Sequence, residues 1–118
     1  EQEAKNFGMD VLVETHTKEE IEMANKLETL LVGINNRNLK TMEVDINNTL
    51  KLKKFINPDK IIVAESGLKN NSDLQLLKEN GIQNFLIGES LMKERDLTFA
   101  TKNILGLVDW IKIYQSLC

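Results

Sequence analysis

Short apolar runs that end in a polar residue or a glycine recur along the chain. In residues 60–67 (KIIVAESG), β-branched residues lead into a carboxylate, a hydroxyl and a glycine. Residues 11–14 (VLVE), 31–35 (LVGIN) and 85–88 (FLIG) have the same form. Continuous apolar runs of this length are typical of strands buried on both faces. The pattern therefore predicts four strands, the last of them over about residues 84–88.

Helix-like sequence separates these runs, and their ends lie between 21 and 30 residues apart. A strand followed by a helix builds a parallel sheet, because the helix returns the chain to the end of the sheet where the next strand starts. We therefore predict an α/β fold of four strand–helix units with a parallel sheet. Residues 1–7 are expected to be the tail of a helix that stops at Gly8, so that the chain begins within such a unit.

The sequence also marks where the connecting helices begin. Thr17 and Glu20 have the spacing of a capping box, and Ile21, Ala24 and Leu27 then recur on one helical face. This helix is predicted to pack against the sheet.

Similar signals mark the later helices. Asp45 is the predicted N-cap of the next helix. Ser72 and Gln75 repeat the spacing of a capping box, and Leu74 and Leu77 are predicted to face the sheet. Residues 89–93 are predicted to form a short helical turn. A longer helix is predicted to start at Leu97, with a buried side made of Ile104, Leu107, Val108 and Ile111.

Composition narrows the class of protein. The chain has 118 residues, of which 42% are hydrophobic and 28% charged, so we expect one globular domain over residues 1–118. A net charge of -3 argues against a nucleic-acid partner. No apolar stretch approaches the roughly 20 residues that span a bilayer, and the chain does not begin with a signal peptide. We therefore expect a cytoplasmic protein without a membrane partner.

Metal and triad chemistry have little support. Cys118 is the only cysteine and His16 the only histidine, which excludes an internal disulfide and argues against a metal site or a His-based catalytic triad. His16 itself is interpreted as a polar residue at the start of a loop rather than as a catalytic group.

Carboxylate and amide side chains end three of the predicted strands. In a parallel sheet the carboxyl ends of all strands meet at one edge, so Glu14, Asn35, Glu65, Ser66 and Gly88 are expected to converge there. Two carboxylates and an amide can supply a base, a positioning group and a polar brace. Taken singly, each of these residues is also consistent with an ordinary polar strand end.

An anion site is predicted beside them. Ser66, Gly67, Gly88 and Glu89 resemble the phosphate site that many barrels build from the loops after two neighbouring strands and a short helix. The carboxylate of Glu89 is expected to point away, with only its backbone N–H facing the anion. Arg37, in the long loop after the second strand, has the geometry to bind a carboxylate or phosphate with two hydrogen bonds.

Four motifs together resemble the indole-3-glycerol phosphate synthase family. They are residues 12–16 (LVETH), 33–39 (GINNRNL), 64–67 (AESG) and 86–92 (LIGESLM). The resemblance runs from residue 1 to about residue 104. The family is a (β/α)8 or TIM barrel, so the resemblance implies half of such a barrel, its C-terminal units five to eight.

The resemblance also implies an activity. It is a carbon–carbon lyase of tryptophan and amino-acid biosynthesis, which decarboxylates and closes the ring of 1-(2-carboxyphenylamino)-1-deoxyribulose 5-phosphate without a cofactor. Glu14 matches a proposed general base of the family, and Asn35 and Glu65 match groups that hold the substrate and a catalytic lysine. Arg37 and Ser66 match substrate-binding residues, Arg37 lying near the anthranilate carboxylate. The phosphate site is matched by Ser66, Gly67, Gly88 and Glu89.

The family's catalytic groups on strands one and three have no match in this chain. The 118 residues alone are therefore expected to be inactive and to need a missing N-terminal half-barrel, or to self-associate. Two other interpretations stay open. One is another phosphate-binding barrel enzyme, such as phosphoribosylanthranilate isomerase, although residues 35–39 argue against it. The other is a half-barrel that binds phosphorylated ligands without catalysis.

Overall fold

Four strands form one sheet in which all strands are parallel. The structure, a computed structural model, describes residues 1–107. The strands are β1 (Leu12–Thr15), β2 (Leu31–Asn35), β3 (Ile61–Glu65) and β4 (Asn84–Leu86), and they lie side by side in sequence order. Val13 pairs with Val32, and Asn35 pairs with Glu65. The parallel α/β arrangement predicted from the apolar runs is therefore confirmed.

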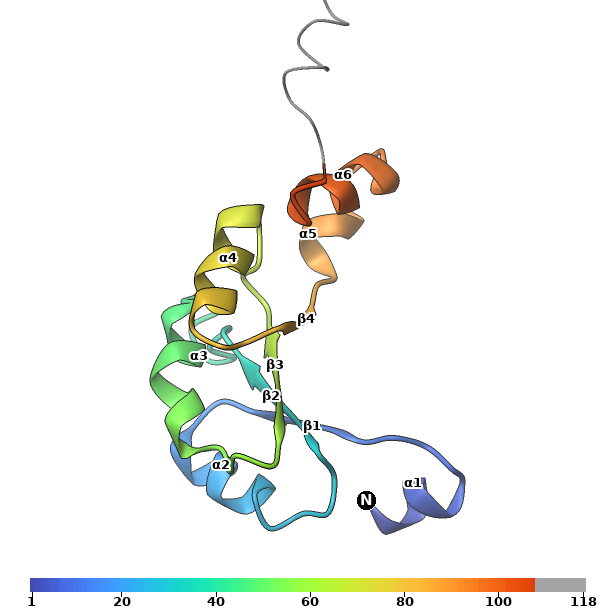
Figure 1. Ribbon diagram of the computed structural model, residues 1–118, viewed down its shortest axis with the longest axis vertical. Coiled ribbons are helices and arrows are strands. Elements are labelled where there is room, and N and C mark those ends of the chain that lie inside the picture. Colours follow the sequence, from blue (N-terminus) through green and yellow to red (C-terminus); the bar gives the residue numbers. More distant parts are fainter. Residues whose placement is uncertain (108–118) are drawn as a thin grey trace, which may run out of the picture.

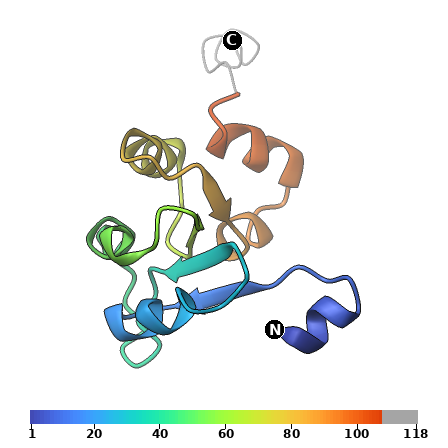
Figure 2. The same ribbon diagram turned by 60° about the horizontal axis from the view of Figure 1, so that its bottom comes forward.

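Helices connect the strands and cover one face of the sheet. The connecting helices are α2 (Lys18–Ala24), α3 (Asn47–Leu52), which continues into the 3-10 turn η1 (Lys53–Phe55), and α4 (Asn71–Glu79). They stack along the same side of the strands in both views (Figure 1, Figure 2). Helix α1 (Gln2–Asn6) precedes β1, and α5 (Glu89–Met92) and α6 (Leu97–Ile104) follow β4. This arrangement is that of half a TIM barrel.

The core lies between the sheet and these helices. Under α2, Ile21 and Ala24 pack with Val32, Ile34 and Ile56. Under α4, Leu74 and Leu77 are fully buried in a second cluster with Ala64, Leu68, Ile82 and Ile104. Each buried leucine contributes roughly 1.5–3 kcal/mol to folding. The apolar faces of the helices therefore hold the strands in place, and the strand ends beyond the core are free to carry polar groups.

The first predicted capping box is confirmed. The Glu20 N–H donates to Thr17 Oγ1 at 3.2 Å, and the Glu20 carboxylate accepts from the Thr17 N–H at 3.2 Å. The buried positions Ile21 and Ala24 follow as predicted, but Leu27 lies beyond the end of α2 and is 36% exposed.

The other two cap predictions are wrong. Helix α4 is capped by Asn70, whose side chain accepts from the Asp73 N–H at 3.0 Å, whereas Ser72 lies inside the helix. Asn70 has the extended backbone that an N-cap needs, with φ -148° and ψ 173°. Helix α3 begins after Ile46, and the Asp45 carboxylate accepts from the Asn47 N–H at 2.9 Å without being the cap.

The end of the described chain also differs from the prediction. Strand β4 ends at Leu86, two residues before Gly88. Helix α6 starts at Leu97 and buries Ile104 as predicted, but it ends there. Leu107 follows Gly106, whose φ of 72° breaks the helix, and is exposed. Val108 and Ile111 lie outside the described residues. Over residues 1–107, no helix combines the length and the apolar character that crossing a bilayer requires.

The two outer strands generate a prediction about association. Within residues 1–107, β1 and β4 each have a neighbour on one side only. Because unpaired strand edges with apolar side chains bind other strands, we expect the 118-residue chain to self-associate at micromolar concentration. Leu12→Lys places a charge on the β1 edge and should weaken that association, measured by sedimentation velocity.

Leu76→Lys is the matched control, because Leu76 lies on α4 and is 37% exposed against 39% for Leu12. It should leave the association unchanged. A wild-type chain that sediments as a monomer, or an equal effect of the two substitutions, contradicts the prediction.

Candidate active site

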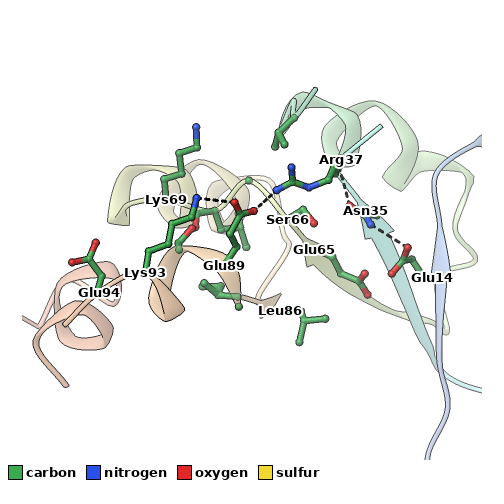
Figure 3. Close-up of a pocket in the computed structure, with 16 residues that line it drawn as sticks. Glu14, Asn35, Arg37, Glu65, Ser66, Lys69, Leu86, Glu89, Lys93 and Glu94 are labelled. Atoms are coloured by element: carbon green, nitrogen blue, oxygen red, sulfur yellow. Dashed lines mark hydrogen bonds and ion pairs between the residues drawn. The ribbon is translucent and has the colours of Figure 1, made fainter. Parts of the chain in front are cut away.

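The residues singled out from the sequence line one pocket at the carboxyl edge of the sheet. The pocket has a volume of about 770 Å³ and is drawn in Figure 3. Its walls include all eight of them, namely Glu14, Asn35, Arg37, Glu65, Ser66, Gly67, Gly88 and Glu89. They come from the strands, from the loops that follow them and, for Glu89, from the start of α5. Parallel pairing therefore brings together groups that are up to 75 residues apart in the sequence.

Asn35 links the end of β1 to the loop after β2. Its Nδ2 donates to Glu14 Oε1 at 3.0 Å, and its Oδ1 accepts from the Arg37 N–H at 2.8 Å. These two contacts orient the Asn35 amide. The hydrogen bond from Asn35 lowers the pKa of Glu14 below its ordinary value. Glu14 is therefore an ionised carboxylate at neutral pH.

Glu65 has the opposite environment. The residue is 3% exposed, and this burial, followed by the hydrogen bond and the negative charge of Glu14, raises its pKa to about 7. Within the described residues, Oε1 of Glu65 has no hydrogen-bond partner. The pocket thus holds two carboxyl groups whose surroundings move their pKa values apart.

Gly33 makes room for the Glu65 carboxyl group. A Cβ atom on Gly33 would lie 2.0 Å from Oε1 and 2.8 Å from Cδ of Glu65. Any side chain at this position of β2 would therefore displace the carboxyl group.

His16 lies beside Glu14. Its Nε2 is 3.2 Å from Glu14 Oε1, and its Nδ1 is 3.5 Å from Glu20 Oε2. His16 follows β1, in the loop position predicted from the sequence, but its contact with Glu14 was not predicted. The available signal was its position one residue beyond the strand and two after Glu14.

The chain turns sharply after β3. Ser66 and Gly67 both have left-handed backbones, with φ of 66° and 74°. A Cβ atom on Gly67 would lie 2.2 Å from Val44 Cγ1, so this position needs glycine for its conformation and for its space. Left-handed residues at a turn point backbone N–H groups to one side, which is the geometry that binds anions.

Glu89 does not point away from the pocket, and this part of the prediction is wrong. Its carboxylate binds Arg37, and Lys93 Nζ donates to its Oε1 at 2.7 Å (Figure 3). The hydrogen bond from Lys93 is the largest cause that lowers the pKa of Glu89, and the positive charge of Arg37 is the second. These two cations neutralise the Glu89 carboxylate. It therefore repels a bound anion less than an unpaired carboxylate would.

Sequence reasoning missed Lys93, and also Lys69, which lines the same side of the pocket. The signal for Lys93 was its position four residues after Glu89 in a predicted helical turn.

Over residues 1–107, no three His, Cys, Asp or Glu side chains gather closely enough to hold a metal ion.

The raised pKa of Glu65 predicts how stability depends on pH. A carboxyl group with a folded-state pKa above its unfolded value stabilises the fold while it is protonated. For Glu65 this stabilisation is complete below the ordinary value of 4.5 and is lost as the pH rises through about 7. We expect the carboxyl carbon of Glu65 to titrate in NMR spectra with a midpoint near 7, far above that of Glu14.

Glu65→Gln stays neutral and should remove this loss of unfolding free energy between pH 4.5 and 7. Glu22→Gln, at an exposed position of α2, is the control and should keep it. A Glu65 midpoint near 4.5, or the same pH dependence in both variants, contradicts the assignment.

Comparisons with known proteins identify the family to which the chain belongs. The sequence model of the family described as indole-3-glycerol phosphate synthase matches residues 1–104. Among the curated relatives, the indole-3-glycerol phosphate synthase of Acinetobacter baylyi is 50% identical over 92 residues, which cover 77% of this chain and 34% of the relative. The enzyme of Azospirillum brasilense is 47% identical over 100 residues, which cover 85% of this chain and 38% of the relative. The enzyme of Legionella pneumophila is 44% identical over 102 residues, which cover 86% of this chain and 40% of the relative.

The match to these relatives spans between 34% and 40% of their length. The family model nevertheless covers all the described residues that form the sheet, the helices and the pocket. The chain therefore belongs to the indole-3-glycerol phosphate synthase family.

Proposed function

We propose that this chain supplies strands five to eight of an indole-3-glycerol phosphate synthase. The reaction converts 1-(2-carboxyphenylamino)-1-deoxyribulose 5-phosphate to indole-3-glycerol phosphate, carbon dioxide and water. The observation that carries the proposal is that Glu14, Asn35 and Glu65 line one pocket together with Ser66 and Gly67. In TIM barrels this edge of the sheet carries the active site.

Glu14 is the proposed general base. Its pKa is lowered by the hydrogen bond from Asn35, so it is ionised and can accept a proton near neutral pH. Asn35 holds the carboxylate in one orientation. The cost of this arrangement is a weaker base, because a lowered pKa also lowers the affinity for the proton.

Glu65 is proposed to hold the substrate or a catalytic lysine. Its buried Oε1 has no partner among residues 1–107, and an ammonium group from strand one or three of a complete barrel would satisfy it. Such a cation would lower the pKa of Glu65 from about 7 and convert it into an ion-pair partner.

Arg37 is proposed to bind the anthranilate carboxylate of the substrate. In the structure its guanidinium group binds Glu89, and Glu89 also binds Lys93. A substrate carboxylate at Arg37 would therefore compete with Glu89, which keeps Lys93 as a partner when it gives up the arginine.

The phosphate group is proposed to lie against the backbone N–H groups of Ser66, Gly67, Gly88 and Glu89. Lys69 and Lys93 line this side of the pocket and add positive charge. Nothing in the proposed chemistry requires a cofactor. Partners other than a phosphorylated small molecule and the complementary half-barrel, such as nucleic acid or a membrane, are not expected, and the cytoplasmic location stays a prediction.

A second function has one observation in its favour. The corner proposed for phosphate consists only of residues in this chain, whereas the proposed catalysis also needs groups from strands one and three. The chain is therefore suited to bind phosphorylated ligands without turning them over. The two experiments that follow separate binding from catalysis.

Binding is tested by titrating the ¹⁵N-labelled chain with ribulose 5-phosphate. The amide signals of Gly67 and Gly88 should shift, because their N–H groups face the proposed phosphate position. Gly8 and Gly81 serve as controls, because neither lines the pocket, and their signals should stay in place. Unmoved signals of Gly67 and Gly88 at saturating ligand would exclude this phosphate site.

Catalysis is tested in a chimera in which the N-terminal half-barrel of the Acinetobacter baylyi relative precedes residue 1. The chimera should form indole-3-glycerol phosphate, and the 118-residue chain alone should not. Glu14→Gln keeps the shape of the side chain but removes the proton acceptor. We expect kcat to fall by about 10² to 10⁴ with little change in phosphate affinity.

Glu22→Gln is the control for this substitution, since Glu22 is exposed on α2 and outside the pocket. It should leave kcat unchanged. Turnover by the isolated chain, or a chimera indifferent to Glu14→Gln, would overturn the proposed roles.

A further inference from the structure

Asn36 is a buried polar residue that the proposed mechanism does not use. It follows Asn35 at the end of β2, is 3% exposed and does not line the pocket of Glu14 and Glu65. Its side chain instead lies between the end of β3 and the start of α3.

Both backbone groups and both side-chain groups of Asn36 are hydrogen-bonded. Its N–H donates to the Glu65 carbonyl oxygen at 2.8 Å, and its own carbonyl oxygen accepts from the Asp45 N–H at 3.0 Å. Its Nδ2 donates to the Ser66 carbonyl oxygen at 3.1 Å. Its Oδ1 accepts from the N–H and the hydroxyl of Thr49 at 3.1 and 2.7 Å. Fully paired buried networks of this kind hold one conformation.

The residue held by this network has an unfavourable backbone. Ser66 has a φ of 66°, which residues other than glycine rarely adopt and which persists only where surrounding contacts impose it. Asn36 binds two successive carbonyl groups there, those of Glu65 and Ser66. The side chain of Asn36 thus continues the pairing of β2 with β3 beyond the last strand pair, Asn35 and Glu65.

Fixing the Ser66 carbonyl also fixes the next N–H group. In a trans peptide the C=O and the N–H of the same unit point in opposite directions, and the N–H of this unit belongs to Gly67. Asn36 binds the carbonyl of this peptide unit, so the Gly67 N–H points away from Asn36, and Gly67 is one of the residues that line the pocket. The Asn36 amide that binds the Ser66 carbonyl therefore also fixes the direction of the Gly67 N–H at the wall of the pocket.

The network is anchored from the helix side as well. Thr49 is fully buried in α3 and binds Asn36 Oδ1 through two donors. In the same helix, Asn48 Nδ2 donates to the Asn35 carbonyl oxygen at 3.1 Å. The first turn of α3 therefore sets the position of Asn36, and Asn36 sets the position of the corner.

We propose that Asn36 is a positioning residue that holds the Ser66–Gly67 corner in its anion-binding conformation. The identity of the anion as a phosphate rests on the proposed function, whereas the shape of the corner does not. The role is distinct from general support of the fold, because it acts on one peptide unit that faces the pocket.

The test compares Asn36→Ala with Asn70→Ala in the 118-residue chain. Asn70 is the N-cap of α4, so its loss also destabilises the protein, but the capping contact lies outside the pocket. Without any ligand, Asn36→Ala should shift the Gly67 amide signal strongly, and Asn70→Ala should leave it nearly unchanged. With inorganic phosphate as the probe, Asn36→Ala should raise the dissociation constant about fivefold, the effect of one lost hydrogen bond.

Thr49→Val separates the two sides of the network. It removes one donor to Asn36 Oδ1 and leaves Asn36 Nδ2 and its Ser66 contact in place. Its effect on phosphate binding should be smaller than that of Asn36→Ala. Equal Gly67 signals and equal phosphate affinities in Asn36→Ala and Asn70→Ala would overturn the proposal.

A measurement on the unmodified chain keeps the proposal testable if Asn36→Ala does not fold. The Nδ2 protons of Asn36 should exchange with water much more slowly than those of Asn38, which is exposed in the same loop. Equally fast exchange would overturn the proposal. If inorganic phosphate leaves the wild-type Gly67 signal in place, the proposed phosphate site fails, and the ligand-free comparison of the variants still decides the role of Asn36.

Discussion

Parallel pairing is the constraint on which the rest of this structure depends. Because every strand runs in the same direction, every strand presents its carboxyl end at the same edge of the sheet, and the connecting helices cover only the outer face. The register then decides which side chains meet. Asn35 pairs with Glu65, and Gly33 lies between Glu14 and Val63 on the neighbouring strands. A slip of one residue in β1 or in β3 would exchange the two faces of that strand and remove its carboxyl group from the pocket.

Within that edge, the surroundings of each group determine its chemistry. Glu14 and Glu65 are the same residue type, yet the hydrogen bond from Asn35 lowers the pKa of one and burial raises the pKa of the other. Two glycines make the position of Glu65 possible. Gly33 leaves space for the Glu65 carboxyl group, and Gly67 allows the sharp turn of the chain after β3. On the other side of the pocket, Glu89 balances Arg37 and Lys93 in the same way that a bound anion would.

The sequence predicts those features that depend on neighbours along the chain. The four apolar runs, the capping box at Thr17 and the buried pair Leu74 and Leu77 are all local patterns, and the structure confirms them. The choice between Asn70 and Ser72 as a cap was not predictable from spacing, because both precede an acceptor by three residues and only the backbone angles separate them.

Contacts between distant segments were harder to predict. Arg37 and Glu89 are 52 residues apart, and nothing in either motif indicates that their side chains meet. Asn36 resembles any polar loop residue in the sequence, although it is buried between two strands and a helix. That two carboxyl groups meet at one edge with different pKa values was predicted from the sequence, but which of the two has the raised pKa depends on the burial of Glu65 and on the contact between Asn35 and Glu14.

The most direct test of the account is a crystal structure of the chimeric barrel with indole-3-glycerol phosphate bound. The account predicts that the phosphate lies within hydrogen-bond distance, about 3 Å, of the N–H groups of Gly67 and Gly88. It also predicts that the indole ring lies on the side of the pocket that holds Glu14 and Glu65. A phosphate bound elsewhere, or a ligand whose ring lies away from both carboxyl groups, would contradict it.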